Sequence, residues 1–195
     1  MGRDLKLKQD HVRFKKVSDL CHGTILHLGS SNLARDYTLH NYLKERHKEA
    51  YSVGLKGSDF IQDLGKENWK INGTYDTVIA PEIIEHIENP SQFLRNCNKL
   101  LKKGGRLIVT TPNASSLIYF KNPNWCVNFK REYKEDNAHV HTFTSGMLRY
   151  HLERIGMKKI KYEYLNGFIR NPLGYFIGIM LPRLRGDILI WGDKI

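Results

Sequence analysis

The chain has 195 residues, of which 41% are hydrophobic and 26% charged, with a formal net charge of +11 at pH 7 and three cysteines. This length predicts a single domain with a sizeable core, and the composition is ordinary for a soluble globular protein. The odd number of cysteines, none in a C-x-x-C spacing, argues against a disulfide framework or a zinc site, and we expect a cytoplasmic protein without a signal peptide.

Strands and helices are predicted to alternate in the first part of the chain. After an N-terminal extension (residues 1–22), the hydrophobic pattern predicts a strand at 24–28, a helix at 33–47, a strand at 50–55 and a short strand at 59–62. Only three residues separate the last two strands, whereas a parallel crossover needs roughly a dozen, usually a helix. We therefore expect a shortened or missing strand and helix around residues 56–73.

The middle of the chain, residues 76–113, has the pattern of a βαβ unit. An apolar strand at 77–80 leads into an acidic turn, and Asn89 and Pro90 begin a helix that Gly104 and Gly105 are predicted to end. The next strand is expected at 106–110. Such units build parallel sheets that bind ligands at the carboxyl ends of their strands. The polar residues that follow the first strand are therefore predicted to lie at a functional edge.

The last third of the chain contains two segments of uncertain role between regular elements. Residues 112–140 form a long connection, expected on the substrate side, before a helix over 147–155 that Thr144 or Ser145 caps. Strands are expected at 159–164 and 187–191. Between them, residues 168–186 are apolar and flanked by arginines. We interpret this segment as lid-like cover for the core, with a hydrophobic substrate wall or a peripheral contact with anionic lipid as alternatives.

Two stretches of the chain resemble class I S-adenosylmethionine-dependent methyltransferases, in the group that includes the ubiquinone-biosynthesis enzymes. These stretches are YDTVIAPEIIEHIENPSQFLRNCNKLLKKGGRLIVTTPN, at 75–113, and HVHTFTSGMLRYHLERIGM, at 139–157. The resemblance covers roughly residues 23–167. It implies an α/β, Rossmann-like, doubly wound fold with a mostly parallel seven-stranded sheet and one antiparallel strand near the C-terminus.

The resemblance also implies that S-adenosylmethionine is the cofactor. The positions that correspond to its contacts are His27, Gly29, Ser30, Lys56, Asp63, Leu64, Ala80 and Glu82. Gly29 allows a close backbone approach, but His27 and Lys56 replace acidic residues of the family, and Ser31 stands in the turn where the family has glycine. Lys56 can only donate hydrogen bonds, so the usual acceptor for the ribose is missing, which weakens binding by ~1–3 kcal/mol unless Asp59 substitutes.

Carboxylates and histidines near the predicted functional edge suggest catalytic or metal-binding roles. Glu82, Glu85 and His86 have spacings that place them on one side of a helical turn, and such a set suits Mg²⁺ or Mn²⁺. Relatives with a metal add a later histidine, here His139 or His141, which share one face of an extended segment. We assign catalysis to His86, His139 and Glu85, and a metal to Glu82, Glu85, His86 and His141. In the alternative without a metal, His86 acts as a base or holds the loop.

Three functions agree with these observations. The first is O-methylation of a small acceptor or of one linked to a lipid or a sugar. The second is methylation of RNA, which the basic charge and the metal-like group favour. The third is a non-catalytic binding module, which Ser31 and Lys56 favour because they alter the cofactor motif.

Overall fold

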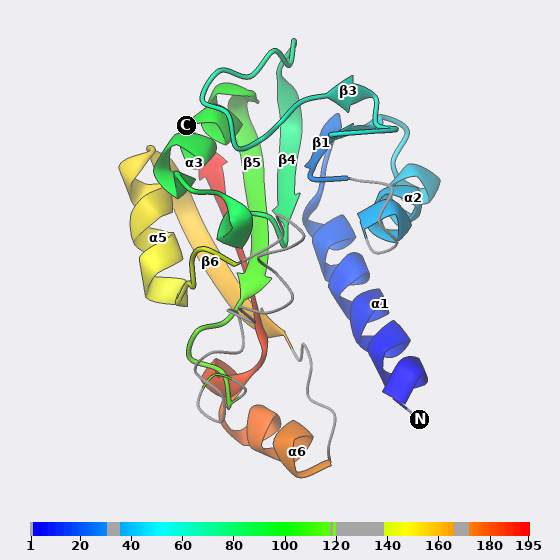
Figure 1. The fold of residues 1–195 in the computed structure, drawn as a ribbon, viewed down its shortest axis with the longest axis vertical. Coiled ribbons are helices and arrows are strands. Elements are labelled where there is room, and N and C mark those ends of the chain that lie inside the picture. Colours follow the sequence, from blue (N-terminus) through cyan, green and yellow to red (C-terminus); the bar gives the residue numbers. More distant parts are fainter. Residues whose placement is uncertain (1, 31–35, 118, 120–138, 166–171) are drawn as a thin grey trace.

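The computed structural model describes residues 2–30, 36–117, 119, 139–165 and 172–195. In this part of the chain seven strands form one sheet in the order β3-β2-β1-β4-β5-β7-β6 (Figure 1). Strands β1 to β5 pair in parallel, and β7 pairs antiparallel with both β5 and β6. The predicted seven-stranded, mostly parallel α/β sheet is confirmed.

The elements alternate along the chain as expected. The strands are β1 (Ile25–Leu28), β2 (Ala50–Gly54), β3 (Phe60–Ile61), β4 (Tyr75–Pro81), β5 (Leu101–Pro112), β6 (Met157–Leu165) and β7 (Asp187–Lys194). The α-helices are α1 (Gly2–Leu20), α2 (Asp36–Arg46), α3 (Pro90–Lys99), α5 (Ser145–Arg154) and α6 (Pro172–Met180). Two 3-10 turns, η1 (Ile84–His86) and η3 (Pro182–Leu184), complete the described elements.

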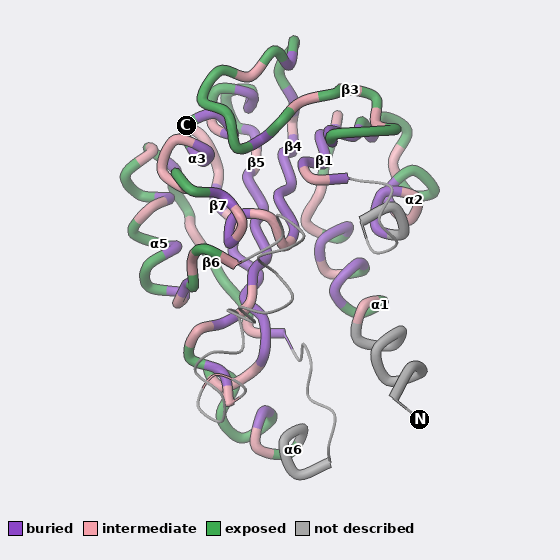
Figure 2. The backbone as a smooth tube through the Cα atoms, in the orientation of Figure 1, coloured by how far each residue is buried: buried purple, intermediate pink, exposed green. Residues whose placement is uncertain are grey.

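Helices cover both faces of the sheet. Successive strand residues point to opposite faces, so Ile25 belongs to the core under α1 and α2, while Leu26 belongs to the core under α3 and α5. Figure 2 shows the central strands as the most continuously buried part of the backbone. The N-terminal extension contributes to this core, because α1 buries Phe14 and Val17 against the sheet.

The edge beside β2 is irregular, as the short spacing predicted. Strand β3 has two residues and follows β2 with no helix between them. Helix α6 lies away from this edge strand, beyond the carboxyl ends of β5 and β6 (Figure 1). Its side chains Phe176, Ile179 and Met180 are exposed, and the interpretation of residues 168–186 as a lid stays a prediction.

Local capping patterns predicted where helices begin better than where they end. Asn89 accepts a hydrogen bond from the backbone N–H of Gln92, and Thr144, not Ser145, accepts one from that of Met147. However, α3 ends at Lys99, and Gly104 and Gly105 belong to β5 instead of ending the helix. A Cβ atom on Gly105 would lie 2.9 Å from the carbonyl oxygen of Lys102, so this glycine permits a close backbone approach in the strand.

Candidate functional site

The turn after β1 and the segment after β2 meet closely at the carboxyl edge of the sheet. Gly29, which follows β1, has a φ of 83°, and its N–H donates to the carbonyl of Val53 at 2.9 Å. The carbonyl of Ser30 accepts a hydrogen bond from Ser58 Oγ at 2.5 Å. A Cβ atom on Gly54 would lie 2.3 Å from that same carbonyl oxygen. Backbone therefore forms this part of the edge, which suits the close binding of an extended ligand.

Replacing Gly54 by alanine tests whether this close approach matters for binding. The new Cβ would overlap with backbone, so the turn after β1 must move. We expect Gly54→Ala to weaken binding of the ligand of this turn by about tenfold or more, which corresponds to about 1.4 kcal/mol. Calorimetric titration measures the effect. Gly146→Ala is the control, since its Cβ would have only ordinary contacts and we expect unchanged affinity.

The turn also contacts the segment that carries the acidic and histidine residues. A Cβ atom on Gly29 would lie 2.8 Å from Ile83 Cδ1, and Ile83 directly precedes η1. Of the predicted cofactor contacts, Gly29 and Ser30 thus lie together at this edge. Ala80 is buried in β4 and Leu64 in the core, while Ser31 lies outside the described residues.

His27 does not face the turn as predicted. Its side chain is fully buried on the α2 side of β1, with its ring centroid 5.7 Å from that of His40. Neither ring has a hydrogen-bond partner among the described residues. Burial, reinforced by His40, lowers the pKa of His27 to about 3, so its imidazole is neutral in the folded protein. This position of the strand directs the imidazole into the core beside His40, and a contact of His27 with the cofactor stays a prediction.

The predicted ribose-binding residues also differ from expectation. Lys56 is exposed. Oδ2 of Asp59 accepts hydrogen bonds from Ser52 N at 2.8 Å and Ser52 Oγ at 2.7 Å, which fix this side chain beside β2. Burial opposes ionisation of Asp59, but these bonds hold its pKa below the usual value. Asp63 is exposed and accepts a bond from the backbone N–H of Gly65.

Glu82 lies apart from the metal-like group in which it was predicted. It has a φ of 51° and precedes η1, so it does not share a helical face with His86. Its Oε1 instead accepts a hydrogen bond from Thr110 Oγ1 at 2.8 Å and lies 3.4 Å from the Arg13 guanidinium. Arg13 comes from α1 and is buried, and no sequence motif marked it as part of this edge. Glu82 therefore connects α1 to the ends of β4 and β5.

The ion pair of Arg13 and Glu82 should contribute to stability. We expect Arg13→Met to lower the free energy of unfolding by about 2 kcal/mol, less than for a fully buried pair, because Glu82 keeps its bond from Thr110. Urea denaturation followed by circular dichroism measures this loss. Lys15→Met removes an exposed pair with Asp19 on the same helix and should have little effect. Equal losses in the two variants would contradict the assignment.

Glu85 holds the later histidine segment against η1. Its backbone carbonyl accepts hydrogen bonds from the N–H groups of Val140 at 2.9 Å and His141 at 3.1 Å. Its buried side chain accepts a bond from Thr111 Oγ1 at 2.9 Å. Burial and the nearby charge of Glu82 raise the pKa of Glu85 well above its usual value. Both effects disfavour the charged carboxylate, so Glu85 ionises less readily than an exposed glutamate.

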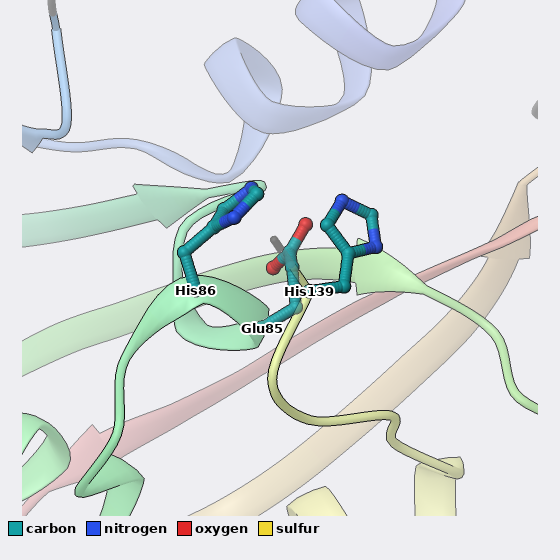
Figure 3. A group of neighbouring side chains, drawn as sticks. All are labelled: Glu85, His86 and His139. Carbon is teal, nitrogen blue, oxygen red and sulfur yellow. The ribbon is translucent and has the colours of Figure 1, made fainter. Parts of the chain in front are cut away.

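His86 and His139 are brought together beside this carboxyl group. Figure 3 shows Glu85 between the two histidines, and their ring centroids are 4.6 Å apart at an interplanar angle of 82°. One ligand atom from each of the three residues lies within 4.8 Å of the others. Both imidazoles are partly exposed, whereas Glu85 is buried. This group can accept a proton from a bound molecule, and its donor atoms also suit a divalent ion.

His141 does not belong to the group, contrary to the prediction. Its Nε2 lies 3.1 Å from the backbone carbonyl oxygen of Glu88, away from the ring of His86. Consecutive N–H groups, of Val140 and His141, bond the same carbonyl, so the segment bends there and the simple alternation of an extended strand is lost. The metal-like set is therefore Glu85, His86 and His139 in place of the predicted set with Glu82 and His141.

Comparisons with known proteins give consistent results. A family model described as a methyltransferase domain matches residues 21–162. The ubiquinone biosynthesis O-methyltransferase of Xanthomonas oryzae pv. oryzae is 32% identical over 106 residues, which cover 51% of this chain and 43% of that protein. The chain thus matches less than half the length of this curated relative.

Solved structures show the same fold at low sequence identity. A SAM-dependent methyltransferase from Archaeoglobus fulgidus has a TM-score of 0.64 at 16% identity, covering 100% of this chain and 95% of that one. The N-methyltransferase NodS from Bradyrhizobium japonicum, in complex with S-adenosyl-l-homocysteine, has a TM-score of 0.61 at 11% identity, covering 96% and 86%. At these identities the likeness establishes the fold alone.

Proposed function

This chain belongs to the methyltransferase domain family, and on that premise we propose that it transfers a methyl group from S-adenosylmethionine to a hydroxyl oxygen. The acceptor we propose is a small molecule or one linked to a lipid or a sugar. The observation that carries this proposal is the pair of His86 and His139 at the carboxyl edge of the sheet. Through Ile83, the turn that bears His86 is packed against the glycine turn after β1.

The proposed reaction assigns distinct roles to the residues of this edge. When bound, S-adenosylmethionine supplies an electrophilic methyl group, which the acceptor oxygen takes with departure of S-adenosylhomocysteine. His86 or His139 accepts the proton that the hydroxyl loses, a role that imidazole performs well near neutral pH. Glu85 holds the segment that carries His139 against η1 through its backbone carbonyl. Most of the rate enhancement would come from holding the acceptor in line with the methyl group.

The residues of the cofactor side fit S-adenosylmethionine in part. Gly29 and Gly54 allow the turn after β1 to pack closely against Ile83 and against the end of β2, which places the backbone of this turn at the edge where we propose the methionine portion binds. At the ribose position, exposed Lys56 provides no acceptor, and the carboxylate of Asp59 is bound to Ser52. We therefore expect cofactor binding, but with lower affinity than an acidic residue at position 56 would give.

Restoring an acceptor at position 56 tests this interpretation of the cofactor site. We expect Lys56→Asp to tighten binding of S-adenosylmethionine by about tenfold, within the ~1–3 kcal/mol that an unpaired ribose hydroxyl group costs. Isothermal titration calorimetry measures the affinity. Lys103→Asp makes the same change of charge at the start of β5 and should leave the affinity unchanged. A decrease in affinity in Lys56→Asp would contradict the proposed place of the ribose.

The decisive experiment is a titration of the full chain with S-adenosylmethionine, followed by an acceptor screen. Binding, together with release of S-adenosylhomocysteine that depends on an added hydroxyl compound, is the expected result. No binding at millimolar cofactor would overturn the proposal and favour a non-catalytic binding module. Binding with methylation of nitrogen-containing acceptors only would overturn the choice of oxygen.

Methylation of RNA is a second candidate, favoured by two observations. The net charge of +11 suits an anionic acceptor, and Glu85, His86 and His139 offer a donor set for Mg²⁺ or Mn²⁺. This candidate requires an RNA affinity that falls steeply with salt. It also requires Mn²⁺ binding that His139→Ala removes and His141→Ala retains. Without salt-dependent RNA binding, the small-molecule acceptor remains the better proposal.

A further inference from the structure

Apolar side chains gather on the exposed side of α6 and at the residue that follows it. Phe176, Ile179, Met180 and Leu181 are 60%, 48%, 65% and 43% exposed. Figure 2 shows the described part of α6 as largely exposed, below the carboxyl ends of β5 and β6. A contiguous group of large apolar side chains on a surface marks an interaction site, whereas single exposed ones need no explanation.

Hydrogen bonds fix α6 to the rest of the domain. Arg185 donates from Nε to the carbonyl of Gly178 at 2.8 Å and from a terminal guanidinium nitrogen to that of Tyr164 at 3.0 Å. Asn113, directly after β5, donates from Nδ2 to the carbonyls of Arg183 and Arg185, both at 2.8 Å. The exposed side chains therefore belong to a helix that is anchored to the ends of β5 and β6, near the edge that carries the histidine pair.

The charge around α6 indicates what kind of surface it fits. Residues 171–186 contain no acidic residue, and Arg183 is exposed. The chain as a whole carries a net charge of +11, so two copies repel each other, whereas anionic headgroups attract it. Among the described residues, no helix combines the length and apolar character that crossing a bilayer requires. A short apolar helix with adjacent arginine can instead lie in the interface.

We propose that α6 docks this protein on an anionic membrane surface. Phe176, Ile179 and Met180 enter the boundary between headgroups and acyl chains, and Arg183 faces the anionic headgroups. Because Asn113 links η3 to the end of β5, docking brings the carboxyl edge of the sheet close to the bilayer. The inference does not rest on methyl transfer, since docking depends only on α6 and its anchoring contacts.

Vesicle flotation of the full chain tests the proposal without cofactor or acceptor. We expect binding to vesicles of phosphatidylcholine and phosphatidylglycerol to be at least about tenfold tighter than to phosphatidylcholine alone, and to weaken with salt. The double variant Phe176→Ser/Met180→Ser should lose about tenfold or more of this affinity. Arg183→Gln should weaken binding to the anionic vesicles and leave the neutral ones unaffected.

A matched double variant on another helix provides the control. Met147→Ser/Tyr150→Ser changes two side chains of α5 that are 48% and 55% exposed, and should bind vesicles as the unchanged protein does. Circular dichroism and thermal melting confirm that both double variants fold. Equal binding to neutral and anionic vesicles, or undiminished binding of Phe176→Ser/Met180→Ser, would overturn the proposal. So would a dimer in vesicle-free buffer that this variant dissociates, because a second copy would then occupy the surface.

Discussion

Replacing His86 or His139 by alanine is expected to lower kcat for methyl transfer by about 10² to 10⁴, the usual contribution of a general base. The two rings pack edge to face with their centroids 4.6 Å apart, so we expect both to contact the same bound hydroxyl group. The double variant should therefore be little worse than the more damaging single one, since residues that act as a unit have non-additive effects. Release of S-adenosylhomocysteine with the acceptor found by the screen measures kcat.

His141→Ala is the matched control for these variants. His141 lies two residues from His139, but its ring contacts the backbone carbonyl of Glu88 instead of the pair. We expect the kcat of His141→Ala to change by less than about threefold, which corresponds to about 0.6 kcal/mol in activation free energy. The pH dependence adds a second criterion, because loss of a base should flatten the rise of kcat with pH. A full kcat in both His86→Ala and His139→Ala would exclude the proposed role of the pair.

The buried His27 is expected to make the fold sensitive to acid. Its pKa is about 3 in the folded protein against an ordinary value of 6.5. Below pH 6.5 the unfolded chain therefore binds a proton that the folded chain binds only near pH 3. Stability then falls by about 1.4 kcal/mol per pH unit across this window as the pH decreases. His27→Leu removes this contribution. When the pH falls from 7 to 4.5, the free energy of unfolding of His27→Leu should therefore decrease by about 2 to 3 kcal/mol less than that of the unchanged protein.

Urea denaturation at a series of pH values measures this difference. His22→Leu is the control, because His22 is exposed and lies in the connection just before β1, the strand that contains His27. We expect its stability to follow the pH dependence of the unchanged protein. His40 is also buried with a lowered pKa, owing to burial and to Lys44, and retains part of the acid sensitivity in His27→Leu. An identical acid dependence of His27→Leu and the unchanged protein would show that His27 takes up its proton without unfolding.

The sequence predicted the sheet and the edge that carries the site because both depend on short-range patterns. Apolar runs of strand length, the Asn89 cap and the missing crossover before β3 involve residues close together in the chain. The placement of His86 follows from the same argument, since it lies a few residues after β4. By contrast, Gly104 and Gly105 resemble a helix stop but belong to β5, where Gly105 permits a close approach to the backbone of β4, which is paired beside it.

Which residues contact each other within the site could be determined only from the folded chain. His139 and His141 are equal candidates in the sequence. In the folded chain the carbonyl of Glu85 accepts hydrogen bonds from the N–H groups of Val140 and His141, and the ring of His139 lies beside that of His86. Arg13 reaches Glu82 from a helix that no motif connected to this edge.

Local sequence was thus sufficient for the strands and the position of the functional edge, because periodicity and capping act within a few residues, but it did not predict helices α1 and α6. The direction of each side chain was decided by tertiary packing. The buried face of β1 receives His27, a bond from Ser52 holds Asp59, and a left-handed backbone turns Glu82 toward α1. These orientations depend on contacts between residues distant in the chain, which form only when the sheet and its helices pack together.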